Sequence, residues 1–118
     1  MCVSEKGKVA VANTISRWIK IAKISDVSIS DVQQCQVGEK CIALFNIQGK
    51  FFATDDICTH AHAHLSDGYI DEDRIECPLH QGLFHIPTGR AIAAPPTEDL
   101  KIYQVRIEGD DVLIEVEE

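Results

Sequence analysis

Hydrophobic and polar side chains alternate along much of the chain, with the period of two residues that is typical of β-strands. Residues 18–24 follow this pattern, which predicts a strand that buries one of its two faces. Two further strand-like runs, residues 40–47 and 50–54, flank Gln48-Gly49. Because glycine adopts a positive φ without strain, this arrangement predicts a tight hairpin turn between the two runs.

The C-terminal part of the chain repeats the hairpin pattern. Residues 100–107 and 111–117 are strand-like, and Gly109-Asp110 between them predicts a second turn. Residues 25–30 are rich in Ser and Asp, which favours a turn or one short helical turn. No longer stretch shows the 3.6-residue period of an amphipathic helix. The predicted fold class is therefore all-β, a small antiparallel β-sandwich.

Residues 55–96 break the alternating pattern and contain all five histidines and all four prolines. A rigid β scaffold commonly carries its functional residues in loops of this kind. Within this segment, we expect Tyr69-Ile70 and Arg74-Ile75-Glu76 to pair with each other. The first residues are small and polar, so we expect a flexible extension over residues 1–16 and a single domain over residues 17–118.

Size and charge exclude several classes of function. The chain has 118 residues, of which 45% are hydrophobic, and this is enough for one modest core. Its net charge of −8 leaves no basic stripe that would neutralise the phosphates of a nucleic acid. The same charge disfavours an anionic membrane surface. It is explained by solubility alone, the interpretation that we favour, or by steering toward basic protein partners. We therefore expect neither a nucleic-acid nor a membrane partner.

The sequence also predicts where the protein acts. No apolar run approaches the roughly 20 residues that span a bilayer. Residues 1–8 lack the apolar stretch and the cleavage site of a signal peptide. The five cysteines, an odd number, fit a reducing compartment better than a disulfide framework. We expect a cytoplasmic protein, in which Cys35 and Cys41 are ordinary strand residues.

Two short peptides each combine a thiol with an imidazole: Cys58-Thr59-His60 and Cys77-Pro78-Leu79-His80, with 16 residues between them. Two Cys and two His, one of each per loop, are the ligand set of a Rieske [2Fe–2S] centre. A zinc site with the same ligands is the alternative, although zinc sites usually pair Cys with Cys and His with His. The mixed pairs therefore favour electron transfer over hydrolysis, binding or regulation.

These pairs and the residues around them resemble a known family. The surrounding segments that share the likeness are residues 53–57, 65–69, 81–84, 88–90 and 94–96. Together with the Cys/His pairs, they resemble the Rieske ferredoxins of bacterial aromatic-ring-hydroxylating dioxygenase systems, of the naphthalene and biphenyl dioxygenase type. The likeness extends over about residues 17–117.

The resemblance implies a β-sandwich base with the cluster-binding loops at one tip, within residues 55–96. It implies that Cys58 and Cys77 hold the buried iron of one [2Fe–2S] cluster, and that His60 and His80 hold the exposed iron. Such a ferredoxin carries single electrons from a flavin-dependent, NAD(P)H-oxidising reductase to a terminal Rieske non-haem iron oxygenase. It is not an enzyme by itself.

The resemblance also bears on the reduction potential. Respiratory Rieske proteins carry a disulfide between the two ligand loops, at positions that correspond to Ala63 and Leu79. Neither residue is a cysteine, which places the chain with the low-potential members, and we expect a midpoint below about −50 mV. Two alternatives stay open: a small Rieske subunit of a nitrite reductase-like complex, and a zinc-stapled β binding module.

Polar residues beside the Cys/His pairs have two interpretations each. His62 and His64 are exposed loop imidazoles, the interpretation that we favour, or groups that bind a second metal or tune partner docking by titration. Asp55, Asp56 and Asp67 are expected to be solvated charges, with docking to a basic partner as the alternative.

Overall fold

The computed structural model describes residues 16–58, 63–78, 82–93 and 98–117. Over these residues the chain forms β-strands and two short 3₁₀ turns, which confirms the all-β prediction. The elements are β1 (Ser16–Lys23), η1 (Ile24–Asp26), β2 (Asp31–Val37), β3 (Lys40–Ile47), β4 (Lys50–Asp55), η2 (Leu65–Asp67), β5 (Tyr69–Asp71), β6 (Arg74–Glu76), β7 (Leu83–His85), β8 (Ala91–Ala93), β9 (Ile102–Tyr103), β10 (Val105–Glu108) and β11 (Asp111–Glu117). None of the described elements is a helix long and apolar enough to cross a membrane.

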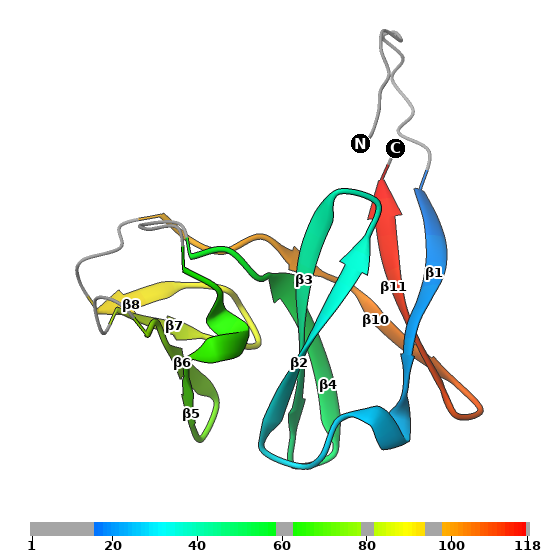
Figure 1. The fold of residues 1–118 in the computed structure, drawn as a ribbon, viewed down its shortest axis with the longest axis horizontal. Coiled ribbons are helices and arrows are strands. Elements are labelled where there is room, and N and C mark those ends of the chain that lie inside the picture. Colours follow the sequence, from blue (N-terminus) through cyan, green and yellow to red (C-terminus); the bar gives the residue numbers. More distant parts are fainter. Residues whose placement is uncertain (1–15, 59–62, 79–81, 94–97, 118) are drawn as a thin grey trace, which may run out of the picture.

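The strands form three antiparallel sheets, shown in Figure 1. Two of them have the orders β1-β11-β10 and β2-β3-β4-β9, and they lie together on the right of the view. We call these two sheets the base. The third sheet, with the order β5-β6-β7-β8, lies to the left, and we call it the small sheet.

Strand β3 separates two hydrophobic cores because both of its faces are buried. Ile42 and Leu44 belong to the core of the base, together with side chains of β11. Ala43 and Phe45 belong to a second core, which they share with Phe84 and other side chains of the small sheet. Successive side chains of a strand point to opposite faces, so a single strand contributes to both cores.

The first predicted hairpin is confirmed. Strands β3 and β4 pair in antiparallel register, with Ile47 opposite Lys50 at the turn. Both turn residues have a positive φ, 56° at Gln48 and 92° at Gly49. This is the requirement of the type I′ turn, whose twist matches that of the two strands.

The second predicted hairpin is only partly right. Strands β10 and β11 pair as expected, with Glu108 opposite Asp111 beside the turn. Residues 102–103, however, form β9, which pairs with β4 in the other sheet. The chain therefore changes sheet at Gln104. Alternation of side chains does not reveal such a change, because both strands follow the same period of two.

The alternation of side chains does not predict the bounds of strand β2, although Cys35 is expected to lie in a strand. The sequence of β2 is mostly polar, and Cys35 is its one buried residue. An edge strand that has water on one face needs few apolar side chains. Burial, and then the negative charges of Asp26 and Asp56, raise the pKa of the Cys35 thiol. Cys35 is therefore a protonated core residue of an ordinary strand, as predicted.

Candidate metal centre

The two predicted cysteine ligands lie in the same hydrophobic core, the one between β3 and the small sheet. Cys58 follows β4 in the chain, and Cys77 follows β6. Their exposed fractions are 3% and 0%, respectively. The fold therefore brings the thiols of two separate loops into one water-poor region.

Each cysteine begins a loop that is closed by the same kind of backbone hydrogen bond. The Cys58 N–H donates to the Ala63 carbonyl over 2.9 Å, and the Cys77 N–H donates to the Gly82 carbonyl over 2.8 Å. Both bonds join a residue to the fifth residue after it. The two loops thus have matching closures, although their sequences and lengths of flanking strand differ.

The predicted histidine ligands lie outside the described residues. His60 falls in segment 59–62, and His80 falls in segment 79–81; His62, which is not a predicted cluster ligand, also lies in segment 59–62. The structure therefore places the thiol-bearing residues and both ends of each loop. The four-ligand assignment of Cys58, His60, Cys77 and His80 stays a prediction.

The β5–β6 hairpin connects the two loops and pairs as predicted. Ile70 lies opposite Ile75, whose side chain is fully buried. The turn between the strands includes Glu72, which has a φ of 59°. Because β6 ends at the residue before Cys77, this hairpin leads the chain directly into the second loop.

Gly68 allows the chain after η2 to approach β6 closely. A Cβ at this position would overlap the carbonyl oxygen of Glu76 and would lie 3.2 Å from the carbonyl oxygen of Leu65. Glycine is therefore required between η2 and β6. Since Glu76 directly precedes Cys77, this contact holds the backbone beside a predicted ligand.

The expectation that Asp56 is a solvated charge is wrong, because its side chain has no exposed surface. Its Oδ1 accepts the backbone N–H of Ser66 over 2.7 Å, and its Oδ2 accepts the Ser66 hydroxyl over 2.9 Å. The side-chain amide of Gln34 donates to Oδ2 over 2.8 Å. Removing a carboxylate from water costs free energy unless hydrogen-bond donors surround it, and Ser66 and Gln34 supply such donors. The sequence gives no sign of this network, since its members are distant along the chain.

His64 supplies a further donor to Asp56. Its Nδ1 lies 2.8 Å from Oδ2 of Asp56, and because an ionised carboxylate can only accept, Nδ1 carries the proton of this bond. The interpretation of His64 as a simply exposed imidazole is therefore incomplete, although 40% of its side chain is exposed. No group of three possible metal ligands occurs among the described residues, so this part of the chain lends no support to a second metal site.

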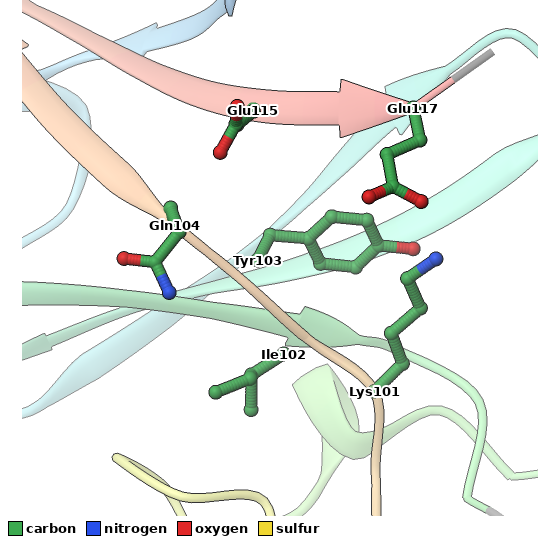
Figure 2. Close-up of a pocket in the computed structure, with 6 residues that line it drawn as sticks. All are labelled: Lys101, Ile102, Tyr103, Gln104, Glu115 and Glu117. Atoms are coloured by element: carbon green, nitrogen blue, oxygen red, sulfur yellow. The ribbon is translucent and has the colours of Figure 1, made fainter. Parts of the chain in front are cut away.

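A cavity of about 140 Å³ lies elsewhere, in the base beside Tyr103 (Figure 2). It is lined by Lys101, Ile102, Tyr103, Gln104, Glu115 and Glu117. In Figure 2 the amine of Lys101 and the carboxylate of Glu117 flank the hydroxyl end of the Tyr103 ring. Cavities that hold small organic ligands usually measure about 300–1,000 Å³, so we assign no ligand to this one.

Tyr103 connects the base to the segment that leads into the first loop. Its hydroxyl donates to Oδ1 of Asp55 over 2.6 Å, so this half-buried carboxylate is hydrogen-bonded as well as partly solvated. The amines of Lys40 and Lys101 lie 5.8 and 5.3 Å from the centre of the Tyr103 ring. Burial, and then the hydrogen bond to Asp55 and its charge, raise the pKa of Tyr103. Tyr103 is therefore a neutral donor at physiological pH.

Asp67 is exposed, as expected.

The described residues fit an iron–sulfur cluster. Thiolate is the ligand that such clusters prefer, and two cysteines meet in one core on loops of matching closure. Their burial also protects the sulfur atoms from oxidation, which follows exposure. The sequence places one imidazole within each loop, which completes a mixed ligand set.

Comparison with known proteins agrees with this arrangement. The family model of the Rieske [2Fe-2S] domain matches residues 17–104. The ferredoxin component of the naphthalene 1,2-dioxygenase system from Pseudomonas putida is 44% identical over 100 residues, which cover 85% of this chain and 96% of that protein. The family match sets aside the zinc-stapled alternative, because the matched domain is described as a Rieske [2Fe-2S] domain.

Solved structures show the same fold. The ferredoxin of Sphingomonas yanoikuyae B1 superposes with a TM-score of 0.81 and 36% identity, over 85% of this chain and 99% of that one. A ferredoxin bound to the oxygenase of carbazole 1,9a-dioxygenase matches with a TM-score of 0.77 and 35% identity, over 82% of this chain and 91% of that one. The resident cofactor is thus one Rieske-type [2Fe–2S] cluster, and the chain is an electron-transfer component that does not catalyse a reaction alone. It belongs to the Rieske [2Fe–2S] family, among the ferredoxin components of bacterial aromatic dioxygenase systems.

Proposed function

We propose that the protein carries single electrons from a flavin-dependent, NAD(P)H-oxidising ferredoxin reductase to a terminal Rieske non-haem iron oxygenase that hydroxylates an aromatic ring. The observation that carries this proposal is the likeness to the naphthalene dioxygenase ferredoxin component, which extends over 96% of that relative. The matched ferredoxin–oxygenase complex supports the oxygenase as one partner. The reductase follows from the need for an electron donor in such a system.

Four residues are proposed to hold the cluster. Cys58 and Cys77 would bind one iron through thiolates, and His60 and His80 would bind the other through neutral imidazoles. When bound between these residues, a [2Fe–2S] cluster would supply one-electron redox chemistry. The chain keeps the thiolates in a buried core and fixes the ends of both loops, which limits rearrangement of the ligands during reduction.

One Rieske domain would span residues 17–118, with the cluster-binding segment at residues 55–96 and an extension at residues 1–16; the family match over residues 17–104 supports the domain. β1 begins at Ser16, next to the proposed boundary. The protein would act in the cytoplasm, where NAD(P)H is available and thiols stay reduced.

We expect a reduction potential near the lower end of the Rieske range, below about −50 mV. No cysteine pair at positions 63 and 79 ties the loops together, and the system delivers electrons from NAD(P)H. A potentiometric titration followed by EPR measures the midpoint. A clearly positive midpoint would contradict membership of the low-potential group.

The experiment that tests the proposed function has two parts. The purified protein should contain two irons and two acid-labile sulfides, with a rhombic Rieske-type EPR signal after reduction by dithionite. Replacing His60 or His80 with Ala should abolish that signal, whereas replacing the nearby His85 with Ala should leave it in place.

The second part reconstitutes electron delivery with purified reductase and oxygenase. Turnover of an aromatic substrate that requires all three proteins would support the carrier role. Stable copurification with a large oxidoreductase subunit, and no exchange between partners, would instead favour the nitrite reductase-like alternative. In that case the cluster would be a fixed relay within one complex.

A further inference from the structure

We propose that Asp56 and the turn formed by residues 65–68 act as a clasp that holds the two ligand loops at the separation the cluster requires. Asp56 is then a positioning residue, which acts on the cluster through the loops. The inference rests on the proposed ligands Cys58 and Cys77. This turn contacts Asp56, two residues before Cys58, and the backbone of Glu76, directly before Cys77.

On the side of the first loop, three hydrogen bonds join the turn to Asp56. Its carboxylate accepts the Ser66 N–H and the Ser66 hydroxyl, over 2.7 and 2.9 Å. Its carbonyl accepts the Leu65 N–H over 2.7 Å. Cys58 is only two residues further along the chain, so any shift of Asp56 is passed to the first thiol across two peptide units.

On the side of the second loop, the turn is in direct contact with β6. The turn is closed by the Gly68 N–H, which donates to the Leu65 carbonyl over 2.8 Å. Gly68 then packs so closely on the Glu76 carbonyl that no side chain fits there. Because Cys77 follows Glu76, the turn limits the position of the second thiol as well.

The clasp is also anchored to the base. The Asp56 N–H donates to the carbonyl of Cys41 in β3 over 2.9 Å, and the Gln34 amide of β2 reaches the carboxylate over 2.8 Å. Nδ1 of His64 completes the set of donors over 2.8 Å. The carboxylate thus connects the base, the first loop and the turn at a single buried point.

The charge of Asp56 matters for this role because all of its neighbours are donors. A carboxylate accepts from several N–H and O–H groups at once, and hydrogen bonds to a charged group are the stronger kind. In Asp56→Asn, the new amide would face the donors of Gln34 and Ser66 and leave buried polar groups without partners. Positions 63 and 79 hold Ala63 and Leu79, so no disulfide ties the loops there, and the clasp provides a non-covalent tie.

The test compares cluster release from the oxidised holoproteins of the wild type, Asp56→Asn and Ser66→Ala. Bleaching of the visible spectrum in the presence of an iron chelator gives the rate. Loss of a group that orients metal ligands typically weakens metal binding by about 10–100-fold, so we expect at least about tenfold faster release from Asp56→Asn. Ser66→Ala removes one of the bonds and should give a smaller increase.

The matched control is Asp67→Asn, which removes an exposed carboxylate from the same turn and should release iron at the wild-type rate. A second readout is the EPR spectrum of the reduced proteins. A shift of the ligand loops changes the g values in Asp56→Asn and Ser66→Ala, whereas a general loss of stability lowers the amount of signal without moving it. Ser66→Thr keeps the hydroxyl and should restore the wild-type g values.

Wild-type release rates and g values in both Asp56→Asn and Ser66→Ala would overturn the clasp. If Asp56→Asn yields no holoprotein, the Ser66→Ala result decides alone by the same criteria. Failure of the ligand assignment looks different: Cys58→Ser would then retain a normal cluster, whatever the behaviour of Asp56→Asn. The two hypotheses are therefore separated by one additional variant.

Discussion

Tyr103 is a residue whose acid–base chemistry is altered by the fold. It is buried, its hydroxyl donates to Asp55, and its pKa is raised by burial first and by Asp55 second. The folded protein thus retains a proton that the unfolded chain releases near pH 10. The stability that Tyr103 contributes is fully present below that pH and is lost as the pH rises towards the pKa in the folded state.

We therefore predict that the free energy of unfolding falls more steeply above about pH 10 in the wild type than in Tyr103→Phe. Below that pH, Tyr103→Phe should be less stable by about 1–3 kcal/mol, because it loses a hydrogen bond to a charged group. Urea unfolding at several pH values measures both effects. Parallel curves for the two proteins over the alkaline range would contradict the raised pKa.

At the residue scale, the sequence reveals ligand chemistry and conceals the network that supports it. Cys58 and Cys77 are predicted ligands because thiols and imidazoles at this short spacing are rare and specific. Asp56 was interpreted as a surface charge because a carboxylate in a polar segment usually is one. Its burial depends on the side chain of Gln34, which lies on a strand 22 residues away in the sequence. No local pattern contains that information.

At the scale of the elements, Gly89 in the turn between β7 and β8 fixes the chain where it returns from the small sheet to the base. Gly89 has a φ of 77°, and its N–H donates to the His85 carbonyl over 2.7 Å. Its own carbonyl accepts the N–H of Leu100 over 2.7 Å, which ties the returning chain in place. A Cβ at this position would lie 2.5 Å from the Leu100 carbonyl oxygen.

We predict that Gly89→Ala destabilises the protein by about 2–4 kcal/mol, since unfavourable backbone strain and overpacking add. Gly38→Ala is the matched control: its φ is 61°, and a Cβ there would have no neighbour within 4 Å. It should cost only about 1 kcal/mol, from the backbone alone. Unfolding in urea of both variants measures the difference, and equal losses would mean that the close approach has no effect.

The predicted elements were right where turn chemistry and alternation agree. The β3–β4 and β5–β6 hairpins were expected from their runs and turns, and both are present. The errors have a common cause: contacts between segments that are distant in sequence decide which residues form these strands and with which partner they pair. Strand β2 is polar because it lies at an edge, and β9 separates from β10 because its partner is β4. Neither partner is encoded in the segment itself.

For the molecule as a whole, the two cores imply two levels of stability. The core of the base contains no predicted cluster ligand, whereas the second core contains Cys58 and Cys77. Binding to the folded state stabilises the part of the protein that provides the ligands. Loss of the cluster should therefore loosen the small sheet more than the base.

We predict that the apoprotein has a Tm lower by about 4 °C or more, since a change of about 1 kcal/mol already shifts Tm by that much in a domain of this size. Amide protection should fall around Ile75 and Phe84 and persist around Ile114. Hydrogen exchange with mass spectrometry, before and after chelation, measures this contrast. Reconstitution should restore the protection, and an equal loss in both cores would contradict the prediction.

Strand β3, whose four central residues are buried on both faces, sets a limit on modular engineering of the molecule. Suppose that residues 55–96, the proposed cofactor-binding segment, were excised as one piece. The segment would lack Ala43 and Phe45, which form part of the hydrophobic core around its own buried side chains. The smallest transplantable unit is therefore larger than the segment that binds the cofactor. A graft onto another β scaffold must therefore include the buried face of β3, or the new scaffold must provide an equivalent apolar face.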